Sequence, residues 1–386
     1  MLLTIIIFVL VLTVLVSAHE LGHFFTARYF GVKAEEFGFG FPPRAIGWYK
    51  NRLGSWQQVI GNRSVESLEN AADEKLRPKL KATVWSLNWL PIGGFVKIKG
   101  EDGEDKNEGD SFAAKKIWQR VVILAAGVTM NILLAWFLFS FGYLIGLPQS
   151  TDTLGPQAIV SESQVVVAQV LPNSIASQAG LQDGDIILRI NDVAIGTEKA
   201  LQDAVAANAG QEARLLIKRG DKEQTIKVVP QAKSGGRATI GIAIFSSGLV
   251  RYPFFPAIWE GLRTTGFILE EIVSSLVGLF REIFKGQDVS GQFAGPVGIA
   301  NITGQAARLG FTYLLQFMAL LSLNLAVINI IPFPALDGGR IIFLLVEKAK
   351  GRPVRREVEA IIHNIGFLLL IALVIFVTFK DIIRLF

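Results

Sequence analysis

The residues best suited to chemistry form the run His19-Glu20-Leu21-Gly22-His23, in which two imidazoles flank a carboxylate. On a helix, positions i and i+4 lie on one face, so His19 and His23 can approach one metal ion while Glu20 lies beside it. Imidazole nitrogen suits zinc, and a neighbouring carboxylate can take a proton from a water that the metal activates. The alternative is a polar cap at the inner end of an apolar segment, but such residues are costly there unless they are paired or bind metal. The run therefore predicts a zinc site with Glu20 as general base.

A third ligand has to come from elsewhere, because a catalytic zinc site uses three protein ligands and leaves one position open. The chain has no cysteine, and its only other histidine, His363, begins an apolar segment with no second ligand at metal spacing. We interpret His363 as an interface residue. Asp337 is the candidate ligand, because Pro332 and Pro334 disrupt the helix before it and two glycines relax the backbone after it. The alternative is a turn that ends a helix and leaves Asp337 as an exposed acid.

The elements that must position these residues are apolar helices. Of the 386 residues, 51% are hydrophobic and 18% are charged, against about 25% charged in a typical soluble protein. Crossing a bilayer takes about 20 apolar residues. The first apolar segment lacks the basic start and the cleavage site of a signal peptide, which favours a retained span. The net charge of +5 is modest and unevenly placed, so we do not predict nucleic-acid binding. Four segments contain no charged residue and predict about four transmembrane helices: 1–18, 121–148, 309–336 and 360–379.

The orientation of these spans follows from positive charge near their ends. Basic residues flank the segments 28–120 and 337–359, whereas 149–168 contains no Lys or Arg. We therefore expect both basic segments in the cytoplasm, and the N-terminus, the C-terminus and the polar segment 160–248 outside. His19 then lies about 27 Å along the first helix from its outer end. Asp337 lies far along the third span, which enters from the same side, so both are expected near the cytoplasmic leaflet of an inner or plasma membrane.

The segment 160–248 has the composition of a separate α+β domain. Strands are predicted at 165–170, 187–191, 213–218 and 224–229, and a helix at 200–207. The strings Ala179-Gly180-Leu181 and Gly184-Asp185-Ile186-Ile187-Leu188-Arg189-Ile190-Asn191 resemble a PDZ domain. The run 239–242 resembles the carboxylate-binding loop of such domains. A peptide C-terminus is therefore a possible partner, bound by strand addition.

Two further segments have recognisable patterns. Residues 83–99 form two β-prone runs around Pro91-Ile92-Gly93-Gly94 and predict a hairpin. The segment 251–308 reads as amphipathic and lies either at the membrane surface or against the PDZ-like domain. The predicted organisation is an α-helical polytopic membrane protein with a membrane-associated β-hairpin and an inserted PDZ-like domain. Its parts are the first half of a membrane protease domain (1–148), the PDZ-like domain (160–248), the amphipathic segment (251–308) and the second half of the protease domain (309–386).

Taken together, HELGH in the first span, the proline-broken NxxPxPxLDG segment in a later one and an intervening PDZ-like domain resemble the site-2 protease family. More narrowly, the chain resembles the bacterial regulator-of-sigma-E protease group, with one PDZ-like domain rather than two. The resemblance implies Zn²⁺ as cofactor, His19, His23 and Asp337 as its ligands, and Glu20 as general base. It also implies that Asn324 and Asn329 hold substrate or orient the site. The stretch Ala126-Gly127…Asn131 resembles a packing motif of the family, with Val128 in place of the usual proline.

The function implied by this resemblance is intramembrane proteolysis of single-span membrane proteins that have already been shortened outside. Anti-sigma factors and signal-peptide remnants are the substrate classes that the family suggests. The hairpin is similar to a membrane-associated β-element of the family and can pair with an extended substrate. Two other functions compete: a catalytically silent scaffold that presents the PDZ-like domain, and a transporter. The intact metal motif disfavours the first, and the lack of inverted repeats disfavours the second.

Overall fold

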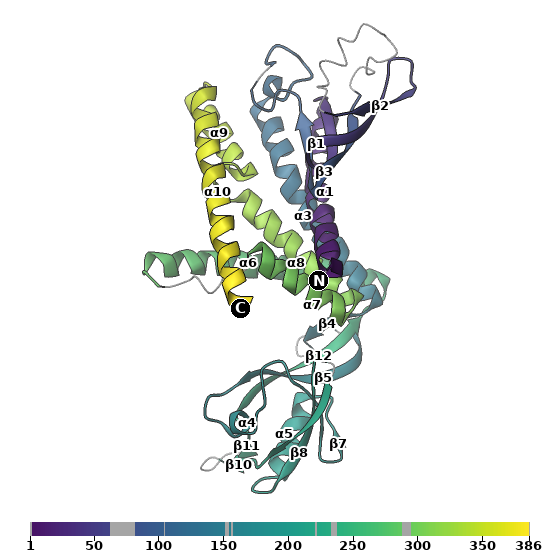
Figure 1. Ribbon diagram of the computed structural model, residues 1–386, viewed down its shortest axis with the longest axis vertical. Coiled ribbons are helices and arrows are strands. Elements are labelled where there is room, and N and C mark those ends of the chain that lie inside the picture. Colours follow the sequence, from purple (N-terminus) through teal and green to yellow (C-terminus); the bar gives the residue numbers. More distant parts are fainter. Residues whose placement is uncertain are drawn as a thin grey trace. The chain divides into compact units, whose positions relative to one another are not determined.

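The computed structural model describes residues 2–61, 82–103, 105–150, 154–155, 157–220, 222–232, 238–287 and 295–385. The chain forms two compact units, and Figure 1 shows its long helices and two β-rich regions. The first unit combines Met1–Phe139 with Leu262–Phe386, and the second is Ser140–Gly261. The first unit contains all the residues predicted to bind the metal. The domain boundaries expected from the sequence stay a prediction.

Four helices in the described part of the chain are long and apolar enough to cross a membrane. Their apolar side chains are widely exposed; on α10, for example, Phe367 is 57% and Leu368 is 66% exposed. Large apolar faces are unfavourable in water, so these helices fit a lipid surrounding. The third span is shorter than expected, because its helix ends at Ile330, before the two prolines, and a separate helix begins at Asp337. The four helices are α1 (Leu2–Tyr29), α3 (Ile117–Ile145), α8 (Phe311–Ile330) and α10 (Arg356–Leu385).

A small sheet lies beside α1 in the order β2-β1-β3 (Figure 1). The hairpin expected at 83–99 is wrong in its pairing, because the two ends of β3 do not pair with each other. Glu36 of β1 pairs with Val84 at one end of β3 and with Lys97 at the other. The fully buried Phe37 of β1 packs on Trp85, which explains why β1 inserts between the two ends. The strands are β1 (Ala34–Lys50), β2 (Trp56–Ile60) and β3 (Val84–Ile98).

The helices α1 and α3 are in backbone contact. A Cβ atom at Gly22 of α1 would lie 2.3 Å from the carbonyl oxygen of Ala126 in α3, so only glycine fits there. Near this contact, Ala27, Ile123 and Leu124 are buried in one apolar cluster. The first unit is completed by the 3₁₀ helix η2 (Phe112–Ala114) and by α7 (Pro296–Leu309) and α9 (Asp337–Lys350).

The second unit is built on an antiparallel sheet in the order β4-β12-β5-β6-β8-β9, with β7 paired to β6. Side chains such as Ile187, Leu201 and Ile217, each at most 2% exposed, fill its core. The strands and the helix that the sequence predicted in this region are confirmed, and their ends differ from the prediction by at most six residues. They are β4 (Leu147–Ser150), β5 (Ile159–Val170), α4 (Ile175–Gln178), β6 (Ile186–Ile190), β7 (Val193–Ala194), α5 (Glu198–Ala207), β8 (Ala213–Arg219), β9 (Lys222–Val228), β10 (Gln231–Ala232), β11 (Ala238–Thr239) and β12 (Ile242–Arg251).

The helix α6 (Phe254–Phe284) follows β12 and has an exposed apolar surface. Ala257, Gly261 and Thr265 form a buried stripe of small residues along it. At Gly261 the backbone comes so close to α3 that a Cβ would lie 2.2 Å from Oγ of Ser140. The large side chains of α6, including Trp259 and Phe267, are more than half exposed. The predicted amphipathic segment is thus at least two helices, α6 and α7.

Candidate metal centre

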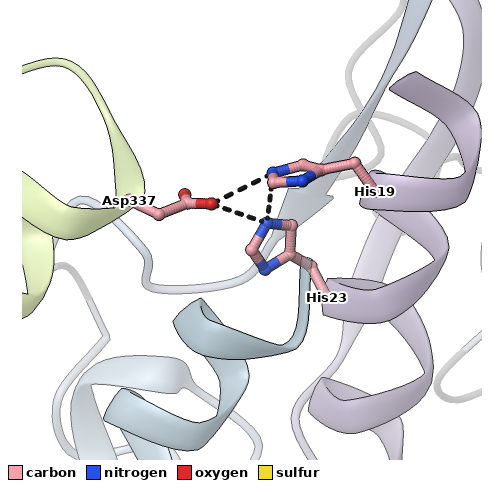
Figure 2. A group of neighbouring side chains, drawn as sticks. All are labelled: His19, His23 and Asp337. Atoms are coloured by element: carbon pink, nitrogen blue, oxygen red, sulfur yellow. Dashed lines mark hydrogen bonds and ion pairs between the residues drawn. The ribbon is translucent and has the colours of Figure 1, made fainter. Parts of the chain in front are cut away.

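Three predicted ligands meet at one point inside the first unit. Figure 2 shows His19 and His23 on one helix, with their rings directed toward the carboxylate of Asp337 from another segment. Nε2 of His19 lies 3.0 Å and Nε2 of His23 lies 3.3 Å from Oδ2 of Asp337, and the two nitrogens are 3.1 Å apart. Both histidines are buried, at 7% exposure. In the described part of the chain this is the only group of three or more His, Cys, Asp or Glu residues with metal-binding spacing.

The arrangement fits a zinc ion. Ligand atoms about 2.0–2.2 Å from a tetrahedral zinc are about 3.4 Å apart, and the three separations here lie within about 0.4 Å of that value. Nδ1 of His23 lies 2.8 Å from the carbonyl oxygen of Ile123 and can only donate to it, which leaves the lone pair on Nε2 free to bind metal. Oδ2 of Asp337 is buried without a hydrogen bond among the described residues and faces the two nitrogens. A cation would satisfy all three atoms.

The space between the ligands is kept open by Gly127 of α3. A Cβ atom at this position would lie 2.4 Å from Nε2 of His23 and 2.7 Å from Nε2 of His19. Any side chain at 127 would therefore enter the volume in which the ligand atoms converge. The sequence assigned this glycine to helix packing; the structure places it against the Nε2 atoms of both predicted histidine ligands.

Asn131, which the sequence also assigned to packing, contacts a ligand. Its Nδ2 lies 3.3 Å from Nδ1 of His19, and its Oδ1 is buried with no partner in the described structure. A zinc-binding His19 carries its proton on Nδ1, and turning the carboxamide over lets Oδ1 accept that proton. Ser322 of α8 donates to the Asn131 carbonyl at 2.8 Å and fixes this part of α3. Asn131 therefore orients His19.

Glu20 lies beside the three ligands and is tied to the sheet. Its Oε2 accepts a hydrogen bond of 3.0 Å from the backbone N–H of Val96 in β3. Val96 pairs with Phe37 of β1 on its other side. The sheet thus fixes the carboxylate that the sequence predicts to be the general base.

Asp337 is presented by a short irregular loop between α8 and α9. Ala335 in this loop has a positive φ of 75°, which is uncommon for a residue other than glycine. Behind Asp337 the chain packs tightly on itself, because a Cβ at Gly338 would lie 2.3 Å from the carbonyl oxygens of Ile330 and Ile331. Asp337 is half-buried, so the alternative of an exposed acid at a turn does not describe it.

The two predicted substrate asparagines lie on α8, apart from this group. Asn324 is exposed, and its Nδ2 donates to the carbonyl of Leu320 in its own helix. Asn329 is partly buried near the end of α8. In the described structure neither of them hydrogen-bonds to His19, His23 or Asp337, so their role stays a prediction.

Two imidazoles, a carboxylate, an adjacent glutamate and an open centre among apolar helices define a zinc-dependent hydrolase. The chain belongs to peptidase family M50, the site-2 protease family, whose model matches residues 7–60 and 74–373. This confirms the resemblance seen in the sequence, and the protein is a zinc metalloprotease.

Several relatives match this chain over almost its full length. Regulator of sigma-W protease RasP of Bacillus subtilis is 30% identical to this chain, and the match covers 99% of each of the two proteins. Zinc metalloprotease RasP of Geobacillus kaustophilus is 29% identical, over 99% of this chain and 98% of the relative. A Clostridium perfringens protein that bears the name of a zinc metalloprotease is 33% identical over 97% of both chains. The PDZ domain of an SdrC-like protein from Listeria monocytogenes matches 22% of this chain and 92% of its own length, at 25% identity and a TM-score of 0.21.

Proposed function

We propose that this protein cuts single-span membrane proteins within the bilayer, with His19, His23 and Asp337 as zinc ligands and Glu20 as general base. The observation that carries the proposal is the convergence of these ligands between helices whose outer faces are apolar. A hydrolytic site in such a place acts on polypeptide that is itself in the membrane. The exposed apolar side chains of the β1–β3 sheet, such as Phe39, Trp89 and Leu90, fit the same surroundings.

The residues divide the chemistry between them. When bound, zinc polarises the scissile carbonyl and activates a water molecule. Glu20 takes the proton of the attacking water and delivers it to the leaving amine. The N–H of Val96 keeps the Glu20 carboxylate at one position, so little reorganisation is needed when the proton moves. Asn131 holds the His19 ring, and the Ile123 carbonyl holds the His23 ring.

The substrate has to be extended at the site, because a helix hides its peptide carbonyls in its own hydrogen bonds. We place the extended segment beside the sheet, since β3 already reaches the catalytic carboxylate through Val96. Asn324 and Asn329 are the side chains of α8 that we assign to substrate holding. A shift of the substrate strand that moves β3 would then also move the Glu20 carboxylate, because Val96 donates a hydrogen bond to it.

The natural substrates that we propose are anti-sigma-factor-like proteins or signal-peptide remnants, cut near the cytoplasmic leaflet. The relative from Bacillus subtilis is named as a regulator of sigma-W. We assign substrate selection to the PDZ-like domain outside the membrane. Its run 239–242 connects β11 to β12 and turns at Gly241, which has a φ of 79°. Further along β12, Ser246 and Glu198 of α5 are joined by a pair of hydrogen bonds.

The test compares wild type with Glu20→Gln and Asp337→Ala in purified full-length protein. Glu20→Gln keeps the side-chain volume but accepts no proton, so we expect retained zinc and a loss of cleavage of at least about 100-fold. Asp337→Ala should lose both zinc and cleavage. A membrane proteome from cells with Glu20→Gln should accumulate truncated single-span proteins. Wild-type cleavage by either variant would refute the assigned roles.

A further inference from the structure

His363 was interpreted from the sequence as an ordinary interface histidine, yet it contacts the loop that presents Asp337. Its Nδ1 lies 2.9 Å from the backbone nitrogen of Ala335 and accepts the hydrogen bond of that N–H. Ala335 is the residue with the positive φ, two positions before Asp337. The left-handed conformation is unfavourable for a residue that carries a Cβ atom. A hydrogen bond at this peptide helps to hold the loop in a conformation that it would otherwise leave.

The ring of His363 is itself held in place. Gly366 lies one turn further along α10, on the same face, and a Cβ there would lie 2.4 Å from Cβ of Pro334. The helix therefore rests directly on the proline before Ala335. On another side, the ring of Phe343 from α9 lies 5.3 Å from the His363 ring, centre to centre. The ring of His363 is thus held between the loop and α9, because its own helix α10 packs on Pro334.

The two ring nitrogens of His363 differ in their surroundings, and this difference fixes the tautomer. Nε2 of His363 has no hydrogen-bond partner in the described structure, and the nearest carboxylate oxygen, on Glu359, is 4.0 Å away. Because Nδ1 accepts the hydrogen bond of the Ala335 N–H, it keeps its lone pair, and the proton of the neutral ring is on Nε2.

We propose that His363 is a positioning residue for the zinc site: through Nδ1 it holds the Ala335 peptide, and so the loop, in the conformation that directs Asp337 at His19 and His23. The proposal rests on the proposed role of Asp337 as a ligand. It assigns no contact between His363 and the metal or the substrate. Groups that support metal ligands typically contribute about 10–100-fold to metal affinity.

The test measures zinc affinity directly, by competition with a chromogenic chelator, in the purified full-length protein. Asn and Gln form a matched pair of variants, because Oδ1 of Asn lies as far from Cα as Nδ1 of His does, whereas the polar end of Gln lies near the position of Nε2. We expect His363→Asn to bind zinc within about threefold of wild type. His363→Gln and His363→Leu should bind about 10–100-fold more weakly.

A further variant separates the hydrogen bond from packing. Ala335→Gly adopts the positive φ without strain, so it should restore part of the zinc affinity that His363→Leu loses. Equal affinities for His363→Asn and His363→Gln, or undiminished affinity in His363→Leu, would overturn the proposal. Asp337→Ala is measured alongside. If it binds zinc normally, the ligand assignment fails; if it binds poorly while the His363 variants bind normally, only the role of His363 fails.

Discussion

Gly127→Ala tests the metal centre without replacing any of the predicted ligands. The added methyl carbon would lie 2.4 Å from Nε2 of His23, whereas carbon atoms pack at about 3.5–4.0 Å, so the ring must retreat by about 1 Å. Zinc–ligand distances vary by only about 0.2 Å, so this movement removes His23 from the ion. A structural zinc site is worth about 10–16 kcal/mol, or about 3 kcal/mol per ligand. At 1.4 kcal/mol per factor of ten, losing one ligand weakens zinc binding about 100-fold or more.

The assay is the zinc content of the purified protein, together with cleavage of a single-span reporter. Gly266→Ala is the matched control, because it makes the same change in helix α6 at a position where a Cβ meets no atom within 4 Å. Alanine favours a helix over glycine by about 1 kcal/mol, so neither variant should weaken its own helix. If Gly127→Ala retains stoichiometric zinc and full cleavage, the ligand atoms do not converge as described.

Three further predictions concern the ligand shell, the orientation and the outer domain. Asn131→Ala should weaken zinc binding about 10–100-fold, whereas Asn131→Asp, which still accepts from Nδ1 of His19, should weaken it less; equal losses would refute the orienting role. The native chain has no cysteine, so exposed single cysteines at Asn107 and Gly351 should react only from the cytoplasm and one at Ser177 only from outside; the reverse pattern would invert the topology. Replacing 160–232 by a short flexible bridge should leave cleavage of an already shortened substrate near normal, and a folded, zinc-loaded but inert variant would show that the domain is needed for catalysis itself.

The sequence predicted those features that depend only on residues close together in the chain. His19 and His23 lie one helical turn apart, so their common face follows from helix periodicity alone. The strands of the second unit follow likewise from local alternation and turn residues. The pairing of β3 could not be predicted in this way, because β1 pairs at Glu36 with both ends of β3, and both ends are distant from Glu36 in the sequence. Local patterns carry no information about which strand lies between two others.

The same limit applies to the residues around the metal. Gly127 and Asn131 were assigned only to a packing motif, because their contacts with the predicted ligands are made with a different helix. The sequence around His363 shows no second ligand at metal spacing, and it could not reveal the contact of this residue with Ala335. Asp337 was found because prolines and glycines mark its loop. The predicted roles of Asn324 and Asn329 depend on a bound substrate, which a sequence pattern does not describe.

The placement of the ligands along the chain has a consequence for biosynthesis. His19 and His23 lie in α1, whereas Asp337 follows α8 in the chain, and α10, which packs on the loop before Asp337 through Gly366, comes later still. A ribosome-bound chain that has inserted its first helices therefore holds an incomplete ligand set. With Asp337 as a ligand, we expect no complete zinc site until α10 has been synthesised and has packed on this loop, so a partly assembled chain should not cut neighbouring membrane proteins.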